Sequence, residues 1–176
     1  MNILGINAYH ADSSAALISE GRLVAAIEEE RLNRHKHCAG FPFMAIQAAL
    51  AQAGLGAGDV QHVGVSRDPK AHLVDKAMQA LKSPGLLGRV ADRLANLGKV
   101  RGVGADLAKA LGGSGAGPTI HHVGHHRSHL ASAFFVSPFE EAACLSIDGF
   151  GDFVSMQRAV GRDRRLEPID EVIFPH

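Results

Sequence analysis

The order of apolar and polar residues at the start of the chain predicts β-strands. Three short apolar runs are separated first by a polar turn at residues 10–14 and then by a tight turn at residues 20–22. Apolar runs bounded by turn residues are typical of strands joined as hairpins. We therefore predict an antiparallel meander with strands at residues 2–6, 15–19 and 23–27.

Helix and strand patterns alternate in much of the remaining chain. Pro42 and Gly54 enclose a segment with apolar residues at helical spacing, which predicts a helix that packs on the meander. The same reasoning predicts strands at residues 60–65, 119–123 and 143–147, and a helix at about residues 128–136 that stops near Pro138.

Residues 68–117 differ in character from the segments around them, and we predict that they form an insertion or cap. Two sets of apolar residues recur here at helical spacing, and each set predicts an amphipathic helix. The sets are Leu87, Val90, Leu94 and Leu97, then Val103, Leu107 and Leu111. The glycine-rich end of this segment, GGSGAGP, predicts a loop.

A weak internal repeat indicates two lobes. Strand, polar turn, strand, glycine turn and strand follow one another in ILGINAYHADSSAALISEGRLVAAIEE and again in CLSIDGFGDFVSMQRAVGRDRRLEPIDE. A duplicated unit of this kind is the plan of the actin, hexokinase and Hsp70 superfamily, although three-stranded meanders are common elsewhere. We predict an α/β actin-like (ribonuclease H-like) lobe at residues 1–140, with a mixed sheet and flanking helices, and the opening meander of a second lobe at residues 141–176.

Composition narrows the function classes. Eighteen basic residues balance eighteen acidic ones, so no net charge favours binding to nucleic acid or to an anionic membrane. The start of the chain lacks the pattern of a signal peptide, and no apolar run reaches the roughly 18 residues of a membrane span. We expect a cytoplasmic protein in which Cys38 and Cys144 are free thiols.

The segment HHVGHHRSH offers candidate metal ligands. His125 and His129 are four residues apart and so share one face of a helix, where two imidazoles can bind one metal. The alternative is a histidine-rich helix start that caps the helix, lies at the surface or binds metal only adventitiously. His126 points about 100° around the helix from His125, toward the substrate or a supporting position.

An acidic residue at a strand end could complete this set. Asp148 follows the apolar run ACLSI and enters a predicted turn, residues 148–152, in which Gly149 and Gly151 let the backbone approach a ligand. The alternative is a simple Asp-Gly hairpin turn. One carboxylate and two imidazoles suit Fe(II), Mn(II) or Zn(II) and leave coordination positions open.

Two further clusters carry candidate chemistry. The first turn contains His10, Asp12 and two serines, which could bind phosphate or deprotonate a hydroxyl, although Asp and Ser are also ordinary turn formers. His10 is a candidate general base because an unperturbed imidazole has a pKa near 6.5. The positive charges that suit an anionic substrate, or else form a solvated face, are Arg31, Arg34 and Lys36.

The sequence resembles a known enzyme family. HADSSAALISEGRLVAAIEEERLNRHKH, then GFP, then HHRSHLASAFFVSPFEEAACLSIDGFGD are similar to the O-carbamoyltransferases of nodulation-factor and antibiotic biosynthesis, with the weakest match over residues 68–117. The motifs of classical phosphate loops, zinc proteases and serine hydrolases are absent from the sequence. The resemblance implies the actin-like fold and a likeness to the universal tRNA threonylcarbamoyladenosine synthase.

The resemblance also implies a site and a reaction. Its metal ligands fall on His125, His129 and Asp148, with Fe(II) the ion we expect, and a fourth acid would lie outside this chain. The implied reaction converts carbamoyl phosphate and ATP to carbamoyl-adenylate, releases pyrophosphate and passes the carbamoyl group to a hydroxyl of a sugar or natural product. The implied roles are catalysis for His10 and Asp12, substrate binding for Arg31, Arg34, Lys36 and His126, and nucleotide binding for Gly149, Gly151 and Asp152.

Members of this family are longer than 176 residues. We therefore expect this chain alone to lack carbamoyl transfer, and a separate chain is one possible source of the missing lobe and of a carboxy-terminal domain. Two alternatives stay open. The chain could be a metal-binding module without catalysis, or another actin-like ATP-dependent enzyme such as a sugar kinase or a metallopeptidase-like protein.

Overall fold

The computed structural model describes residues 1–10, 12–69, 71–72, 102–113 and 117–173. These residues form two compact units. Of the described residues, those in 1–66, 102–113 and 117–122 belong to unit 1. Those in 67–72 and 123–173 belong to unit 2. The first helix predicted in the insertion, at Leu87–Leu97, lies outside the described residues.

A five-stranded mixed sheet forms the centre of unit 1. Its strand order is β3-β2-β1-β4-β5, with antiparallel pairing from β1 to β3 and parallel pairing of β1 with β4 and of β4 with β5. This arrangement confirms the predicted meander and the two strands after it. The strands are β1 Asn2–Asn7, β2 Ser14–Ser19, β3 Arg22–Glu28, β4 His62–Val65 and β5 Thr119–His122.

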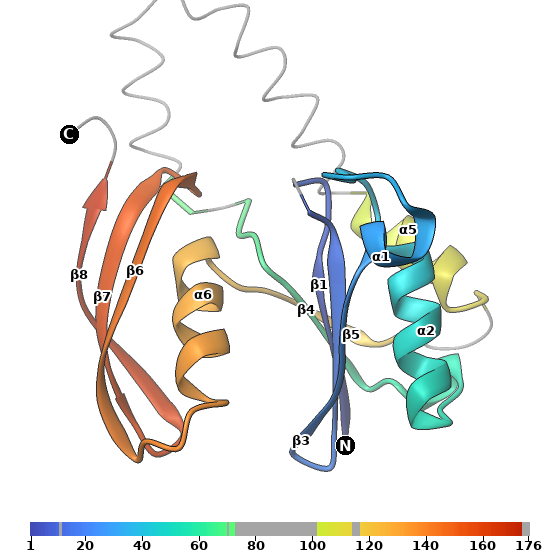
Figure 1. The fold of residues 1–176 in the computed structure, drawn as a ribbon, viewed down its shortest axis with the longest axis horizontal. Coiled ribbons are helices and arrows are strands. Elements are labelled where there is room, and N and C mark those ends of the chain that lie inside the picture. Colours follow the sequence, from blue (N-terminus) through green and yellow to red (C-terminus); the bar gives the residue numbers. More distant parts are fainter. Residues whose placement is uncertain (11, 70, 73–101, 114–116, 174–176) are drawn as a thin grey trace, which may run out of the picture. The chain divides into compact units, whose positions relative to one another are not determined.

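Helices cover one face of this sheet. Helix α2, Phe43–Ala53, begins after Pro42 and ends at Gly54 as predicted, and it packs against β2 and β3 (Figure 1). Its buried Ile46 and Leu50 share a core with Leu4 and Val63 of the sheet. The other helical elements of the unit are α1 Glu29–Asn33, the short 3₁₀ helix Ala57–Asp59 and α5 Val103–Ala110.

Helix α5 was predicted from the sequence, and helix α1 was not. Helix α5 confirms the second helix predicted in the insertion, because Val103 and Leu107 are buried in the core of unit 1. Helix α1 falls in the charged segment for which no element was predicted. It is anchored by Glu29, whose side chain is buried although its neighbours Glu28 and Glu30 are not.

Unit 2 is a three-stranded antiparallel sheet with one helix on it. The strand order is β6-β7-β8, and α6 packs on one face through Leu130 and Phe134, which meet Ala159 and Leu166 (Figure 1). Gly161 permits this contact, since a Cβ atom there would lie 2.6 Å from the Phe134 ring. The elements are α6 His125–Phe134, β6 Glu141–Gly151, β7 Val154–Arg162 and β8 Arg165–Ile173.

Two predictions in this unit were wrong in their bounds. Helix α6 begins at His125, as the argument from the spacing of His125 and His129 assumed, and not near residue 128, as the apolar pattern predicted. Strand β6 continues through residues 148–151, which were predicted to form a turn, although its pairing is irregular between Ile147 and Gly151. The turn itself lies at Asp152 and Phe153, whose φ angles of 51° and 78° are left-handed as in a tight hairpin connection.

Other expectations concern the chain as a whole. Cys38 and Cys144 are free, as predicted. Within the described residues, no helix is long and apolar enough to cross a membrane. By its contacts α6 belongs with the second sheet, whereas the sequence analysis assigned it to the first lobe, and the boundary at residues 140/141 stays a prediction.

The buried Glu29 side chain stabilises α2 and gives the first testable prediction. Its carboxylate accepts hydrogen bonds from the backbone N–H groups of Met44 at 3.1 Å and Ala45 at 2.7 Å, at a helix start where Pro42 has no side-chain cap. Glu29→Ala would leave both donors unpaired and should lower the free energy of unfolding in urea by about 1–3 kcal/mol. Glu28→Ala, at a half-exposed neighbouring carboxylate, is the matched control and should change the free energy of unfolding by less than about 0.5 kcal/mol, because its ion pair with Arg31 lies at the surface.

Candidate functional site

Three side chains of unit 2 converge on one point. His125 and His129 lie one turn apart on α6, and Asp148 lies on β6. The Asp148 Oδ2 atom is 2.6 Å from His125 Nε2 and 3.5 Å from His129 Nε2, and the two Nε2 atoms are 3.1 Å apart. The structure therefore brings together the three residues that the sequence analysis predicted as metal ligands.

Asp152 fixes where α6 begins and hence where His125 points. Gly124 precedes the helix and has no side chain to cap it. The buried Asp152 carboxylate takes this part instead, because its Oδ2 atom accepts hydrogen bonds from the backbone N–H groups of His125 and Asp68, both at 3.0 Å. Asp152 was predicted to bind nucleotide, and in the structure its carboxylate positions the first histidine.

Gly151 makes room for the His125 ring. A Cβ atom at Gly151 would lie 1.9 Å from His125 Cδ2, whereas one at Gly149 would meet nothing within 4 Å. The two glycines predicted beside the nucleotide therefore differ. Gly151 is required by packing against a candidate ligand, and Gly149 is not constrained in this way.

The protonation of the cluster suits metal binding. Burial lowers the pKa of the His125 imidazole below its ordinary value, although its hydrogen bond with Asp148 acts in the opposite direction. The hydrogen bond with His125 lowers the pKa of the Asp148 carboxyl group. Both shifts favour a neutral imidazole beside an ionised carboxylate at neutral pH, which are the forms that bind metal ions.

The separations also suit one ion. Ligand atoms about 2.1 Å from a metal lie roughly 3 to 3.5 Å from each other in a tetrahedral arrangement. Two of the observed separations, 3.1 and 3.5 Å, lie in this range, and the third, 2.6 Å between His125 and Asp148, is shorter and is that of a hydrogen bond. The side chain of His129 is 53% exposed, so one side of the cluster is open to further ligands.

His126 lies in the interior. It is 3% exposed, and its Nε2 atom is 2.9 Å from the backbone oxygen of Val154 while its Nδ1 atom is 2.8 Å from Ser146 Oγ. Because the Val154 carbonyl can only accept, Nε2 carries the proton and Nδ1 accepts from Ser146 in the neutral ring. This geometry favours a supporting role behind His125 and His129 over the predicted contact with substrate.

The first turn of unit 1 forms a second cluster. The side chain of Asp12 contacts His37, whose Nδ1 atom is 3.0 Å from Asp12 Oδ1. The backbone N–H of His37 donates to Glu30 at 3.0 Å, and ligand atoms of Asp12, Glu30 and His37 all lie within 4.8 Å of one another. His10, the predicted base, is exposed on the same turn.

Backbone hydrogen bonds tie this turn to the segment that carries His37. Tyr9 N–H donates to Gly40, and both the backbone N–H and the hydroxyl of Ser13 donate to Cys38. Sequence analysis missed His37 and Glu30, because it treated their segment only as a source of positive charge. A charged segment rich in histidine, following a strand that neighbours the first turn, was the available signal.

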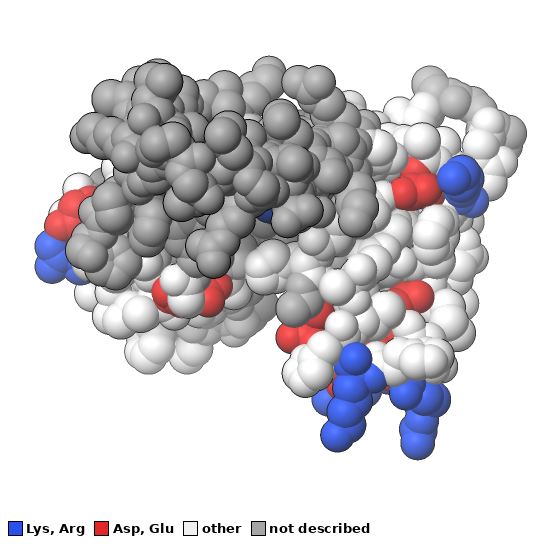
Figure 2. All heavy atoms as spheres, turned by 90° about the horizontal axis from the view of Figure 1, so that it is seen from above, with Lys and Arg blue, Asp and Glu red and all other residues white. Residues whose placement is uncertain are grey.

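The predicted anion-binding side chains lie on and after α1. Arg31 is paired with Glu28 at 3.3 Å and with Glu30 at 3.9 Å, so its charge is partly compensated. Arg34 follows the helix in a left-handed conformation, and Lys36 is exposed in the turn beyond it. Figure 2 shows acidic and basic side chains together on the visible face of the molecule.

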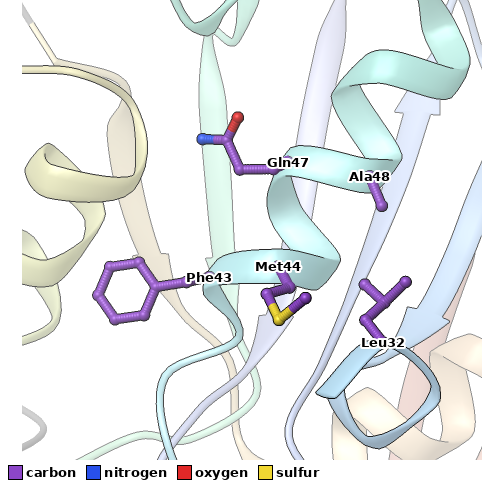
Figure 3. Close-up of a pocket in the computed structure, with 5 residues that line it drawn as sticks. All are labelled: Leu32, Phe43, Met44, Gln47 and Ala48. Atoms are coloured by element: carbon purple, nitrogen blue, oxygen red, sulfur yellow. The ribbon is translucent and has the colours of Figure 1, made fainter. Parts of the chain in front are cut away.

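An apolar hollow on unit 1 offers no comparable chemistry. It is lined from α2 and α1 by Phe43, Met44, Gln47, Ala48 and Leu32 (Figure 3). None of these side chains is a general acid, a general base or an anionic ligand. The two polar clusters are therefore the better candidates for a functional site.

Comparison with known protein families shows which family this chain belongs to. Residues 2–99 and 108–176 match the family described as carbamoyltransferase N-terminus. The chain belongs to this carbamoyltransferase family. Both polar clusters lie within the matched residues.

Relatives within the carbamoyltransferase family are much longer. The chain is 38% identical to the Synechocystis protein sll1178 over 99% of its own length, but it covers 30% of that protein. It is 35% identical to nodulation protein NolNO of Sinorhizobium fredii, covering 93% of this chain and 23% of NolNO. With nodulation protein U of the same organism it shares 31% identity and covers 27% of that protein. The chain thus spans less than a third of these relatives.

Solved structures agree on the fold. YeaZ from Pseudomonas aeruginosa superposes with a TM-score of 0.51 at 16% identity, over 99% of this chain and 67% of YeaZ. A second structure, described as similar to the peptidase YeaZ of the same organism, gives the same TM-score over 66% of its length. These proteins have the actin-like fold, so the predicted fold class of this carbamoyltransferase-family chain is confirmed.

The contact between Gly151 and His125 gives the second prediction. Gly151→Ala would push the His125 ring out of its place and should lower the free energy of unfolding by about 1–3 kcal/mol. Gly149→Ala is the matched control and should cost less than about 0.5 kcal/mol, since nothing obstructs a methyl group there. Urea unfolding and the NMR shifts of the His125 ring measure both effects, and equal losses in the two variants would contradict the steric explanation.

Proposed function

We propose that this chain is the amino-terminal part of a metal-dependent carbamoyltransferase. The proposal is carried by one observation, the convergence of His125, His129 and Asp148 within a chain of the carbamoyltransferase family. The donor set fits a divalent ion, and Fe(II) is our first choice, with Mn(II) and Zn(II) as alternatives. When bound, the ion would neutralise charge on the phosphates of the substrates.

The substrates we propose are carbamoyl phosphate, ATP and a hydroxyl of a sugar or natural product. Carbamoyl phosphate would first lose its phosphate to water, which leaves carbamate and inorganic phosphate. A carbamate oxygen would then attack the α-phosphorus of ATP and displace pyrophosphate, which gives carbamoyl-adenylate. The acceptor oxygen would then attack the carbamoyl carbon, the bond to AMP would break, and the hydroxyl proton would pass to a base. Family membership supports this sequence of steps, and His10 on the first turn is our candidate base.

The remaining roles follow the charge and position of the residues. Asp12 would orient a neighbouring imidazole, as it does His37 in the structure. Arg31, Arg34 and Lys36 would attract the anionic substrates to α1 and the turn after it. Asp152 and Gly151 would contribute to nucleotide binding only indirectly, by positioning the metal ligand His125. This role replaces the direct contact with phosphates that was predicted for them.

Metal binding tests the first part of this proposal. His125→Ala and His129→Ala should each weaken binding of Mn(II) or Zn(II) by at least tenfold, because each removes one of three protein ligands. His35→Ala, at an exposed histidine of unit 1, should leave the affinity unchanged. Isothermal titration calorimetry of the purified chain and of the three variants measures the affinities. Equal affinity in all of them would contradict a metal site at His125 and His129.

Activity tests the second part. The chain alone should show no carbamoyl transfer from carbamoyl phosphate and ATP to hydroxyls of sugars or natural products, because it spans less than a third of the length of its relatives. The same assay on a polypeptide that also carries the rest of the Synechocystis relative should show transfer and pyrophosphate release. Turnover by the chain alone would contradict the expectation. Metal binding without transfer in the longer polypeptide would leave the metal-binding module as the function.

A further inference from the structure

The two meanders of the chain share one pairing register. Pairs in the β1–β2 hairpin and in the β6–β7 hairpin are related by one constant offset in sequence. The equivalent pairs are Ile6–Ala15 and Ile147–Met156, Leu4–Leu17 and Leu145–Arg158, Ile3–Ile18 and Cys144–Ala159, and Asn2–Ser19 and Ala143–Val160. A one-residue slip would turn each side chain to the opposite face, so the shared register makes the faces of the two sheets directly comparable.

An irregularity is shared as well. The pairing of β2 with β3 shifts between Leu17 and Ile18, and the pairing of β7 with β8 shifts between Arg158 and Ala159, which are the equivalent positions. Bulges are specific local features and are not expected to coincide by chance. Unit 1 is therefore a template for what surrounds the corresponding strands of unit 2.

The template shows that, among the described residues, no helix covers one face of the unit 2 sheet. Leu4 and Ile6 are 0% and 3% exposed, and α2 shares their core. Their equivalents Leu145 and Ile147 are 60% and 73% exposed, because α6 packs on the opposite face of β6. Large apolar side chains at such exposure on adjacent positions of one strand face mark an interaction surface.

The same comparison applies to the edge of the sheet. Strand β1 is paired on both sides, with β2 and with the parallel strand β4. Among the described residues, β6 pairs only with β7, so its other edge presents unpaired backbone groups. A long open edge is a template for a further strand.

The uncovered face is not uniformly apolar. Met156 and Val172 extend it next to Ile147, but Arg158 stands where unit 1 has Leu17 and forms an ion pair with Asp170. The large exposed apolar side chains of this face in β6, Leu145 and Ile147, therefore lie toward the β6–β7 turn. A covering helix would place its apolar stripe there and polar residues over the Arg158–Asp170 pair.

We propose that Leu145, Ile147 and the free edge of β6 dock a helix and a parallel strand from the part of the family's polypeptide that lies outside the region matched by this chain. The length of the relatives supports this source, since the chain covers 30% of the Synechocystis protein and 23% of NolNO. A second copy of the chain fits less well. Two copies related by a twofold axis would pair β6 antiparallel, whereas the template requires a parallel neighbour.

The test compares the chain alone with a full-length chimaera, in which this chain replaces the matching region of the Synechocystis relative. In the chimaera, backbone amides of residues 145–147 should exchange with deuterium at least tenfold more slowly than in the chain alone, while those of β3 should be unchanged. Leu145→Glu with Ile147→Glu should remove this protection and lower the melting temperature of the chimaera. In the chain alone the same double variant should leave the melting temperature unchanged, because the side chains of Leu145 and Ile147 are exposed there.

Leu23→Glu, at a half-exposed leucine of β3, is the control and should change neither the deuterium exchange of residues 145–147 nor the melting temperature of either protein. If the double variant does not fold, the single variant Ile147→Ser replaces it. Equal exchange of β6 in the two proteins, or equal destabilisation of both by the double variant, would overturn the proposal. Slow exchange in the chain alone that depends on its concentration would also overturn it, in favour of a second copy. None of these readouts requires carbamoyl transfer, so the docking surface and the proposed reaction can fail independently.

Discussion

The candidate metal centre depends on the buried carboxylate of Asp152. By accepting the backbone N–H groups of His125 and Asp68, it ties the β6–β7 turn to the first residue of α6. That helix start sets the direction of the His125 ring, and Gly151 beside the turn leaves the space that the ring occupies. His129 follows one helical turn later, so both imidazoles reach Asp148 from a helix whose position is set by the same turn.

Local patterns were sufficient where local contacts decide the structure. Short apolar runs separated by turn residues predicted the meanders, and Pro42 and Gly54 predicted the bounds of α2. The start of α6 could not be read in this way, because Gly124 provides no capping side chain and the cap comes from Asp152, far along the chain. The extent of β6 was missed for a related reason, since glycines that usually indicate a turn here continue an irregular strand.

The site was predictable to the extent that spacing alone brings residues together. Two histidines four residues apart on a helix, and an acid after a buried strand, were enough to indicate the cluster. The orientation of a side chain is a different matter. His126 neighbours a candidate ligand but points into the interior, and Asp12 contacts His37 only because backbone hydrogen bonds fold a later segment against the first turn.

The pairing shared by the two meanders ends at Asp148, the acidic member of the candidate metal centre. After Ile6 the first hairpin continues with the pair Asn7–Ser14, whereas after Ile147 the second is interrupted until Gly151–Val154, and Asp148 lies in the interruption. The two equivalent hairpins of a duplicated architecture can thus differ in role. The first hairpin keeps an unbroken ladder, whereas the second loses a few ladder hydrogen bonds and presents the candidate ligand Asp148. A local irregularity can therefore add a candidate ligand to a strand while the fold stays the same.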